Sequence, residues 1–136
     1  MEVQVEHLGD VQFEIRARSH VIDCDQPVEN GGYDEGMTPP ELLLASLGSC
    51  AAFYAAQYLR KERLAREGTR VRVTAEKAPD PARLARFVIE IEAPVDLNAE
   101  QTAGINAAVE HCLIHNTLLH APEIAIQIAQ PVLVAQ

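Results

Sequence analysis

The sequence contains no tryptophan, and all aromatic side chains together make up only 4% of its 136 residues. The core must therefore be aliphatic and rich in alanine. Basic residues are also scarce, because 11 Lys and Arg stand against 20 Asp and Glu, giving a formal net charge of −9. Binders of nucleic acid or of anionic membranes need a basic surface, so this composition argues against both classes.

Cysteine is nearly absent as well, with three residues at Cys24, Cys50 and Cys112. Three are too few for a disulfide scaffold, and an odd number cannot pair off completely. The first residues carry neither a basic start nor an apolar run, so we expect no secretory signal and a cytoplasmic location. Thiols are normally reduced there, and a cysteine is inert, metal-binding or redox-active rather than structural in a bridge.

The length fits one domain over residues 1–136, and 48% apolar with 23% charged residues is a globular rather than a disordered composition. Alternating apolar residues and turn signals predict strands, one long helix and one shorter helix. The order is strands, helix, strands, helix, strand, which predicts an α+β fold with a mainly antiparallel sheet. The expected strands are 2–8, 11–18, 20–23, around 71–73, around 87–91 and 124–128 (with Val132 and Val134 as a continuation), and the shorter helix is 98–112.

The most distinctive segment follows a loop over 24–37 that is rich in turn-forming residues. Thr38-Pro39-Pro40-Glu41 has the form of a helix capping box, and residues 42–59 then run without a charge. Eighteen such residues reach the lower limit of a membrane span, but polar residues interrupt the run and its surroundings are polar. We expect a buried helix ending near Gly68, with no membrane partner. Covering it on every side in so small a chain requires a second subunit.

Two cysteines lie on the expected helices, Cys50 on the long one and Cys112 at the end of the shorter one. Each can be an ordinary small apolar residue of a core. If the two helices pack together and the thiols meet, the pair can instead cycle between dithiol and disulfide.

A reactive thiolate needs a cation nearby. Arg16 and Arg18 are expected on one face of their strand, although a solvated strand face explains them equally well. Glu41 could orient such an arginine, or could serve only the capping box. Nine residues of helix place it about 180° around the axis from Cys50. Cys24, between two aspartates, is expected to be partly exposed and of low reactivity.

A metal site is an alternative use of the second cysteine. The order His111-Cys112-x2-His115-x4-His120 supplies residue types that bind zinc. Its spacing matches no closed structural zinc pattern, so no metal and no other cofactor is expected.

The segment around Cys50 resembles the osmotically inducible protein C and organic hydroperoxide resistance (OsmC/Ohr) family, in its broad OsmC-like branch. The second cysteine lies in a segment that looks like the family's second active-site motif, and the similarity extends over essentially the whole chain. The residues that carry it are Asp25-Gln26-Pro27, Gly31-Gly32, Asp34, the run from Gly36 to Cys50, and Cys112-Leu113-Ile114-His115-Asn116-Thr117-Leu118.

The resemblance implies an intertwined homodimer with two central helices and active sites at the subunit interface. It implies a thiol peroxidase that reduces organic hydroperoxides in oxidative stress defence, with an external dithiol as reductant. Cys50 would attack the peroxide, Cys112 would resolve the sulfenic acid as a disulfide, and Arg18 (or Arg16) would stabilise the thiolate. The family's arginine-orienting glutamate stands ten residues before the first cysteine, where this chain has Pro40, so Glu41 is its nearest counterpart. The alternative function is a non-enzymatic dimer that binds an apolar molecule or a partner at its interface.

Overall fold

The computed structural model describes residues 1–130. It forms two antiparallel sheets and three helices, so the expected α+β class is confirmed. The elements are β1 (Gln4–Gly9), β2 (Gln12–Ala17), β3 (His20–Cys24), a short 3-10 turn (Val28–Asn30), α1 (Pro39–Lys61), β4 (Arg70–Ala78), β5 (Arg83–Glu92), α2 (Ala99–Val109) and α3 (Leu113–Leu119).

The first sheet has the strand order β1-β2-β3, with every neighbouring pair antiparallel. The strands predicted at the N-terminus are confirmed to within two residues at each end. Arg18, however, lies in the two-residue turn after β2, with a φ of 56°. Short hairpin loops need a residue of positive φ. The expectation that Arg18 shares a strand face with Arg16 is therefore wrong.

The loop after β3 is held by Asp25, whose side chain is buried at 1% exposure. Its carboxylate accepts hydrogen bonds from the backbone N–H groups of Gln26, Tyr33 and Glu35 at 2.7, 3.0 and 3.1 Å. Burial by itself raises the pKa of Asp25, but these backbone donors, with the Gln12 amide, outweigh it and lower that pKa overall. Asp25 thus fixes the loop that leads into α1.

The long central helix α1 begins as predicted. The Thr38 hydroxyl accepts a hydrogen bond from the Glu41 backbone N–H, and the Glu41 carboxylate accepts one from the Thr38 backbone N–H. The helix ends at Lys61, and Arg63 takes the left-handed conformation with a φ of 58°. The expectation that Gly68 ends the helix is wrong, because Arg63 supplies the left-handed turn five residues earlier.

Only one stripe of α1 is buried within the single chain, formed by Leu47, Ala51, Ala55 and Leu59. Phe53, on another side of the helix, is 59% exposed, so the helix is not buried on every face as expected. By length and composition alone α1 could cross a membrane. Its buried stripe packs against α2 and β4, as in a core helix.

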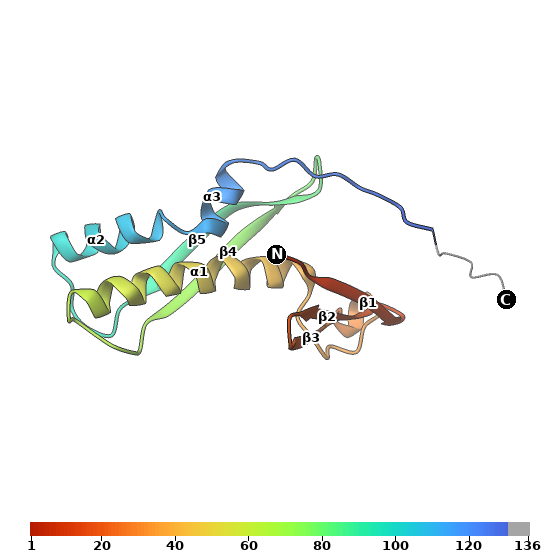
Figure 1. Ribbon diagram of the computed structural model, residues 1–136, viewed down its shortest axis with the longest axis horizontal. Helices are drawn as coiled ribbons and strands as arrows, with labels where there is room; N and C mark the ends of the chain where they lie inside the picture. Colours follow the sequence, from red (N-terminus) through yellow and green to blue (C-terminus); the bar gives the residue numbers. More distant parts are fainter. Residues whose placement is uncertain (131–136) are drawn as a thin grey trace.

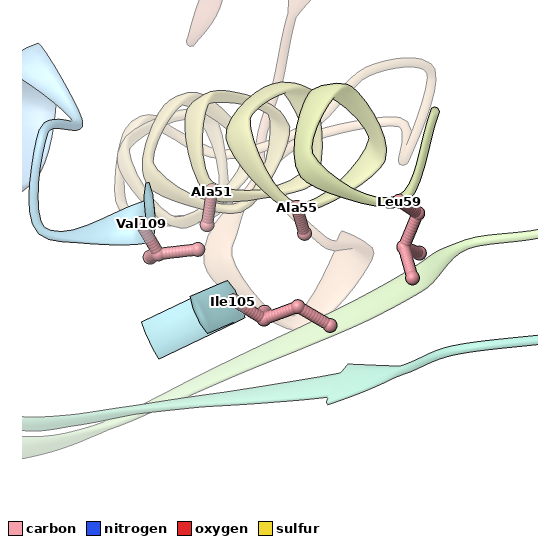
Figure 2. Packing of buried hydrophobic residues seen from close by; sticks show 5 residues of the cluster. All are labelled: Ala51, Ala55, Leu59, Ile105 and Val109. Carbon is pink, nitrogen blue, oxygen red and sulfur yellow. The ribbon is translucent and has the colours of Figure 1, made fainter. Parts of the chain in front are cut away.

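The core lies where α1 crosses α2, and Figure 2 shows Ala51, Ala55 and Leu59 facing Ile105 and Val109. Alanines on the α1 side let the two helices approach closely. Full burial of a side chain such as Leu59 contributes about 1.5–3 kcal/mol. The alanine-rich core expected from the composition is therefore confirmed.

The second sheet is the antiparallel hairpin of β4 and β5, and α1 lies against both strands. Gly48 permits this approach, because a Cβ at this position would lie 3.0 Å from the Val73 Cγ2 atom. In Figure 1 the hairpin crosses α1 at an angle, and α2 and α3 both lie above α1 in this view. The three-stranded sheet stands apart, beyond the N-terminal end of α1.

The C-terminal part departs from the sequence prediction in two ways. The predicted helix over 98–112 forms as α2 but ends at Val109, and Cys112 stands after it as the N-cap of a further helix, α3, that the sequence did not predict. The predicted strand 124–128 is not formed, and its isoleucines are 84–90% exposed. A strand needs a neighbouring strand to satisfy its backbone, and within residues 1–130 this segment pairs with none. Val132 and Val134 lie outside the described residues.

Candidate thiol site

Cys50 lies in the middle of α1 and is half-buried. Leu43, Leu47 and Cys50 follow one another at spacings of four and three residues, so they lie along one face of the helix. The thiol therefore shares its side of α1 with two large apolar side chains.

Cys112 is completely buried and comes directly before α3. Its Sγ atom accepts a hydrogen bond from the backbone N–H of His115 at 3.3 Å, as a cap of that helix. Cys50 is the neighbouring side chain that acts most strongly on the Cys112 thiol, so the two sulfur-bearing side chains lie close together. The two cysteines that the sequence singled out, 62 positions apart, are thus brought together in the reduced state.

The surroundings of Cys112 raise the pKa of its thiol. Burial is the largest cause and the neighbouring Cys50 side chain the next, while the His115 backbone N–H acts in the opposite direction. Cys112 therefore keeps its proton at neutral pH. A group held as a neutral thiol suits the second partner of a disulfide exchange better than the first.

An apolar groove of about 650 Å³ is formed by α1, β5 and α3. Neither cysteine lines it, but its walls include Leu43 and Leu47 on the helix of Cys50, and His115, three residues after Cys112. Its lining consists of Leu43, Leu47, Arg83, Leu84, Phe87, Ile89, His115, Leu118 and Leu119. The groove can hold a hydrophobic group beside the thiols.

A larger hollow of about 790 Å³ lies at the other end of α1, lined by Arg60, Arg63, Leu64, Ala65 and Arg66. It contains neither a thiol nor a histidine, and Cys50 is about 15 Å away along the helix axis from Arg60. The chemistry of the molecule is therefore centred on the groove and not on this hollow.

Glu41 lies at the first turn of α1, about 13.5 Å along the axis from Cys50. Its carboxylate accepts hydrogen bonds from the Thr38 backbone N–H at 2.8 Å and from the Thr38 hydroxyl at 2.9 Å. The backbone N–H of Thr38 is the main cause that lowers the pKa of Glu41. Within one chain Glu41 is engaged as a cap.

The two candidate arginines belong to the three-stranded sheet. Arg16 forms an ion pair with Glu14 on the same strand, and Arg18 is exposed in the turn between β2 and β3. Among the described elements, this sheet makes no extensive contact with α1 or α3 of its own chain. Neither arginine is brought to Cys50 by the fold of a single chain.

Cys24 is buried at 4% exposure, which corrects the expectation that it is partly exposed. It pairs through a backbone bridge with Met37, which closes the loop over it. Burial, followed by the charge of Asp25, raises the pKa of its thiol. Its low reactivity as a nucleophile follows from that environment.

The histidine and cysteine side chains that suggested a zinc site are not brought together in residues 1–130. In residues 1–130, no three side chains of His, Cys, Asp or Glu lie close enough to hold a metal ion. His111 and His120 are exposed, whereas His115 is half-buried in the groove. From the sequence, His115 is a possible metal ligand and part of the second motif of the resemblance, and neither predicts its place in the groove. One feature of the sequence could have predicted that His115 lies next to Cys112. It follows Cys112 by three residues, which is the spacing between a helix cap and the backbone N–H that it binds.

Comparison with known structures reveals the same fold. The chain resembles an osmotic stress induced and detoxification response protein from Psychrobacter arcticus 273-4, with 26% identity, a TM-score of 0.76 and 85% of each chain covered. It resembles an OsmC like protein from Mycoplasma pneumoniae, with 20% identity, a TM-score of 0.73, and 88% and 87% covered. An organic hydroperoxide resistance protein OsmC from Legionella pneumophila shares 16% identity and the fold, with a TM-score of 0.65 and 88% of each chain covered.

No curated protein sequence gives a significant match. The family model described as "OsmC-like protein" matches residues 32–127, which contain both Cys50 and Cys112. This span covers most of the chain, including α1 and the β4–β5 hairpin. The chain therefore belongs to the OsmC-like protein family.

Proposed function

We propose that this chain is a thiol-dependent peroxidase that reduces organic hydroperoxides. The observation that carries the proposal is the proximity of Cys50 and Cys112, with an apolar groove formed by residues of the same helices. One related structure is an organic hydroperoxide resistance protein, which is consistent with the same chemistry. The groove would take the alkyl or aryl part of the peroxide, a part that hydrogen peroxide lacks.

In the first step the Cys50 thiolate attacks the terminal oxygen of the hydroperoxide. An S–O bond forms, the O–O bond breaks, and the alkoxide takes up a proton to leave as an alcohol. Cys50 becomes a sulfenic acid, and the peroxide is reduced by two electrons. The half-buried position of Cys50, against the fully buried Cys112, favours Cys50 as the attacking thiol.

In the second step the Cys112 sulfur attacks the sulfur of the Cys50 sulfenic acid. The S–S bond forms, the S–O bond breaks, and the hydroxide leaves as water with the Cys112 proton. An external dithiol then reduces the disulfide and is itself oxidised. Because the two thiols are already in contact, this step needs little rearrangement of α1 or α3.

We further propose that the functional unit is a homodimer in the cytoplasm. Within residues 1–130 the N-terminal sheet makes no extensive contact with the helices or the other sheet, and the exposed isoleucines at 124, 126 and 128 alternate as in a strand. A second copy would cover these surfaces and the outer side of α1, and could bring Arg18 to the Cys50 of its partner. Light scattering should give about twice the chain mass of 14.9 kDa. A monomer at micromolar concentration would contradict the dimer.

The test of the activity is peroxide consumption with a dithiol as reductant. Cys50→Ser should abolish turnover, and Cys112→Ser should stop at the sulfenic acid after one equivalent of peroxide. Cys24→Ser is the matched control, because Cys24 is buried under the loop and apart from the pair, and it should keep the wild-type rate. Full turnover by Cys50→Ser would disprove the proposal.

The groove also supports the second candidate, a dimer that binds an apolar molecule without chemistry. Native mass spectrometry of the purified protein distinguishes the two. A co-purified ligand retained by the Cys50→Ser variant, together with a wild type that consumes no peroxide, would favour binding.

A further inference from the structure

His115 holds a buried polar atom without a partner. Its ring Nδ1 atom is the one side-chain nitrogen or oxygen in residues 1–130 that is fully buried in a non-exposed residue and has no hydrogen bond. A buried group left unpaired is costly, because its hydrogen bond to water is lost and not replaced, so such an atom calls for an explanation.

The location of His115 gives that explanation. Its backbone N–H lies 3.3 Å from the Cys112 Sγ atom, so the residue belongs to the turn that holds the thiol pair. Its side chain lines the apolar groove opposite Leu43 and Leu47, on the helix of Cys50. The imidazole thus borders the space in which the organic part of a hydroperoxide would lie.

The other ionisable side chain of the groove is Arg83. Its Nη1 atom donates to the backbone carbonyls of Asp80 and Pro81, both at 3.1 Å, within the β4–β5 turn. Histidine is the side chain that ordinarily exchanges a proton near neutral pH, whereas arginine keeps its proton. Of the groups that line the groove, His115 alone can both take up and return one.

We propose that His115 is the proton donor to the leaving alkoxide, an inference that rests on the proposed peroxidase function. Cys50 releases its proton to water, and the His115 imidazole takes up a proton from water before the reaction. As the S–O bond forms and the O–O bond breaks, the imidazolium gives its proton to the alkoxide oxygen, which leaves as an alcohol. The proton released by Cys50 balances the one taken up by His115, so no net acid is consumed and the neutral imidazole is restored.

The leaving group decides how much this donor matters. An alkoxide is strongly basic and leaves slowly without a proton, and a positioned general acid typically accelerates such a step by about 10²–10⁴-fold. A peroxycarboxylic acid instead releases a carboxylate, which leaves without protonation. The donor should therefore act on an alkyl or aralkyl hydroperoxide and be dispensable for a peroxy acid.

The experiment measures the rate of Cys50 sulfenic acid formation in the Cys112→Ser background, which isolates the first step. The probes are cumene hydroperoxide and peroxybenzoic acid, two aromatic substrates with different leaving groups. Two variants, His115→Asn and His115→Gln, replace the Nδ1 and Nε2 positions with amides, and both keep the backbone N–H toward residue 112. Circular dichroism verifies that the variants fold. His111→Asn is the matched control, because His111 directly precedes Cys112 in the sequence and its side chain is exposed.

We expect at least one folded His115 variant to react about 10²–10⁴-fold more slowly with cumene hydroperoxide and within a few-fold of its parent with peroxybenzoic acid. His111→Asn should match the parent with both. Equal losses with both peroxides, or no loss with cumene hydroperoxide, would overturn the role of His115 while leaving the peroxidase function intact. A parent protein that reacts with neither peroxide would overturn the proposed function itself.

Discussion

The Cys112 thiol lies beside Cys50 although the two residues stand on different helical segments, one inside α1 and the other at the start of α3. Burial and, after it, the neighbouring Cys50 raise the pKa of Cys112, so its thiolate is rare at neutral pH. The two cysteines are therefore unequal before any peroxide arrives. That inequality gives the proposed order of reaction a physical basis.

The first prediction concerns this inequality. At pH 7, iodoacetamide should label Cys50 much faster than Cys112 or Cys24, because the last two are buried and their pKa values are raised. Peptide mass spectrometry after a short reaction measures the three rates separately. Labelling of Cys112 ahead of Cys50 would reverse the proposed roles.

The second prediction concerns Arg18. If it stabilises the Cys50 thiolate across a dimer interface, Arg18→Ala should lower the alkylation rate of Cys50 at fixed pH, because a nearby cation favours the charged form. Arg16→Ala is the matched control on the same strand, since Arg16 is paired with Glu14. An unchanged rate for Arg18→Ala with a lower one for Arg16→Ala would assign the role to Arg16.

The third prediction separates the two roles considered for Glu41. Thr38→Ala should lower the free energy of unfolding by about 0.5–2 kcal/mol, as the loss of an N-cap does. Glu41→Gln should keep most of the stability, because glutamine also completes a capping box. Thermal denaturation measures both effects. Peroxide turnover of folded Glu41→Gln then tests the arginine-orienting role: that role requires a slower rate, and capping alone requires the wild-type rate.

The fourth prediction follows from the lowered pKa of Asp25. A carboxyl whose pKa is lower in the folded than in the unfolded state adds stability above its unfolded value of about 3.9, and this stability is lost as the pH falls through the folded value. Asp25→Asn should therefore lower the melting temperature most at neutral pH, and the difference from wild type should shrink in acid. Asp23→Asn, an exposed neighbour on β3, should show no such pH-dependent difference. A constant deficit for Asp25→Asn down to pH 2 would contradict the assigned ionisation.

The sequence alone predicts those structural elements correctly that depend on residues close to one another in the chain. Thr38 and Glu41 predicted the start of α1, the helix expected from residue 98 begins at Ala99, and the strands expected at 2–8 and 11–18 pair as the first hairpin. Each depends on hydrogen bonds or turn geometry within a few residues. The motif around Cys50 likewise indicated the family, which the match over residues 32–127 confirmed.

What the sequence alone left undecided involves residues far apart in the chain. The strand expected at 124–128 is absent because a strand exists only with a partner, and alternation of isoleucines supplies none. Cys24 is buried because the loop to Met37 folds over it, although its acidic neighbours suggested exposure. The sequence by itself determined that the chain has a capped apolar helix with a cysteine in its middle. The tertiary structure decided that Cys112 caps a further helix, meets Cys50 and brings His115 to the groove, because only packing of α1 against α3 and β5 joins these residues.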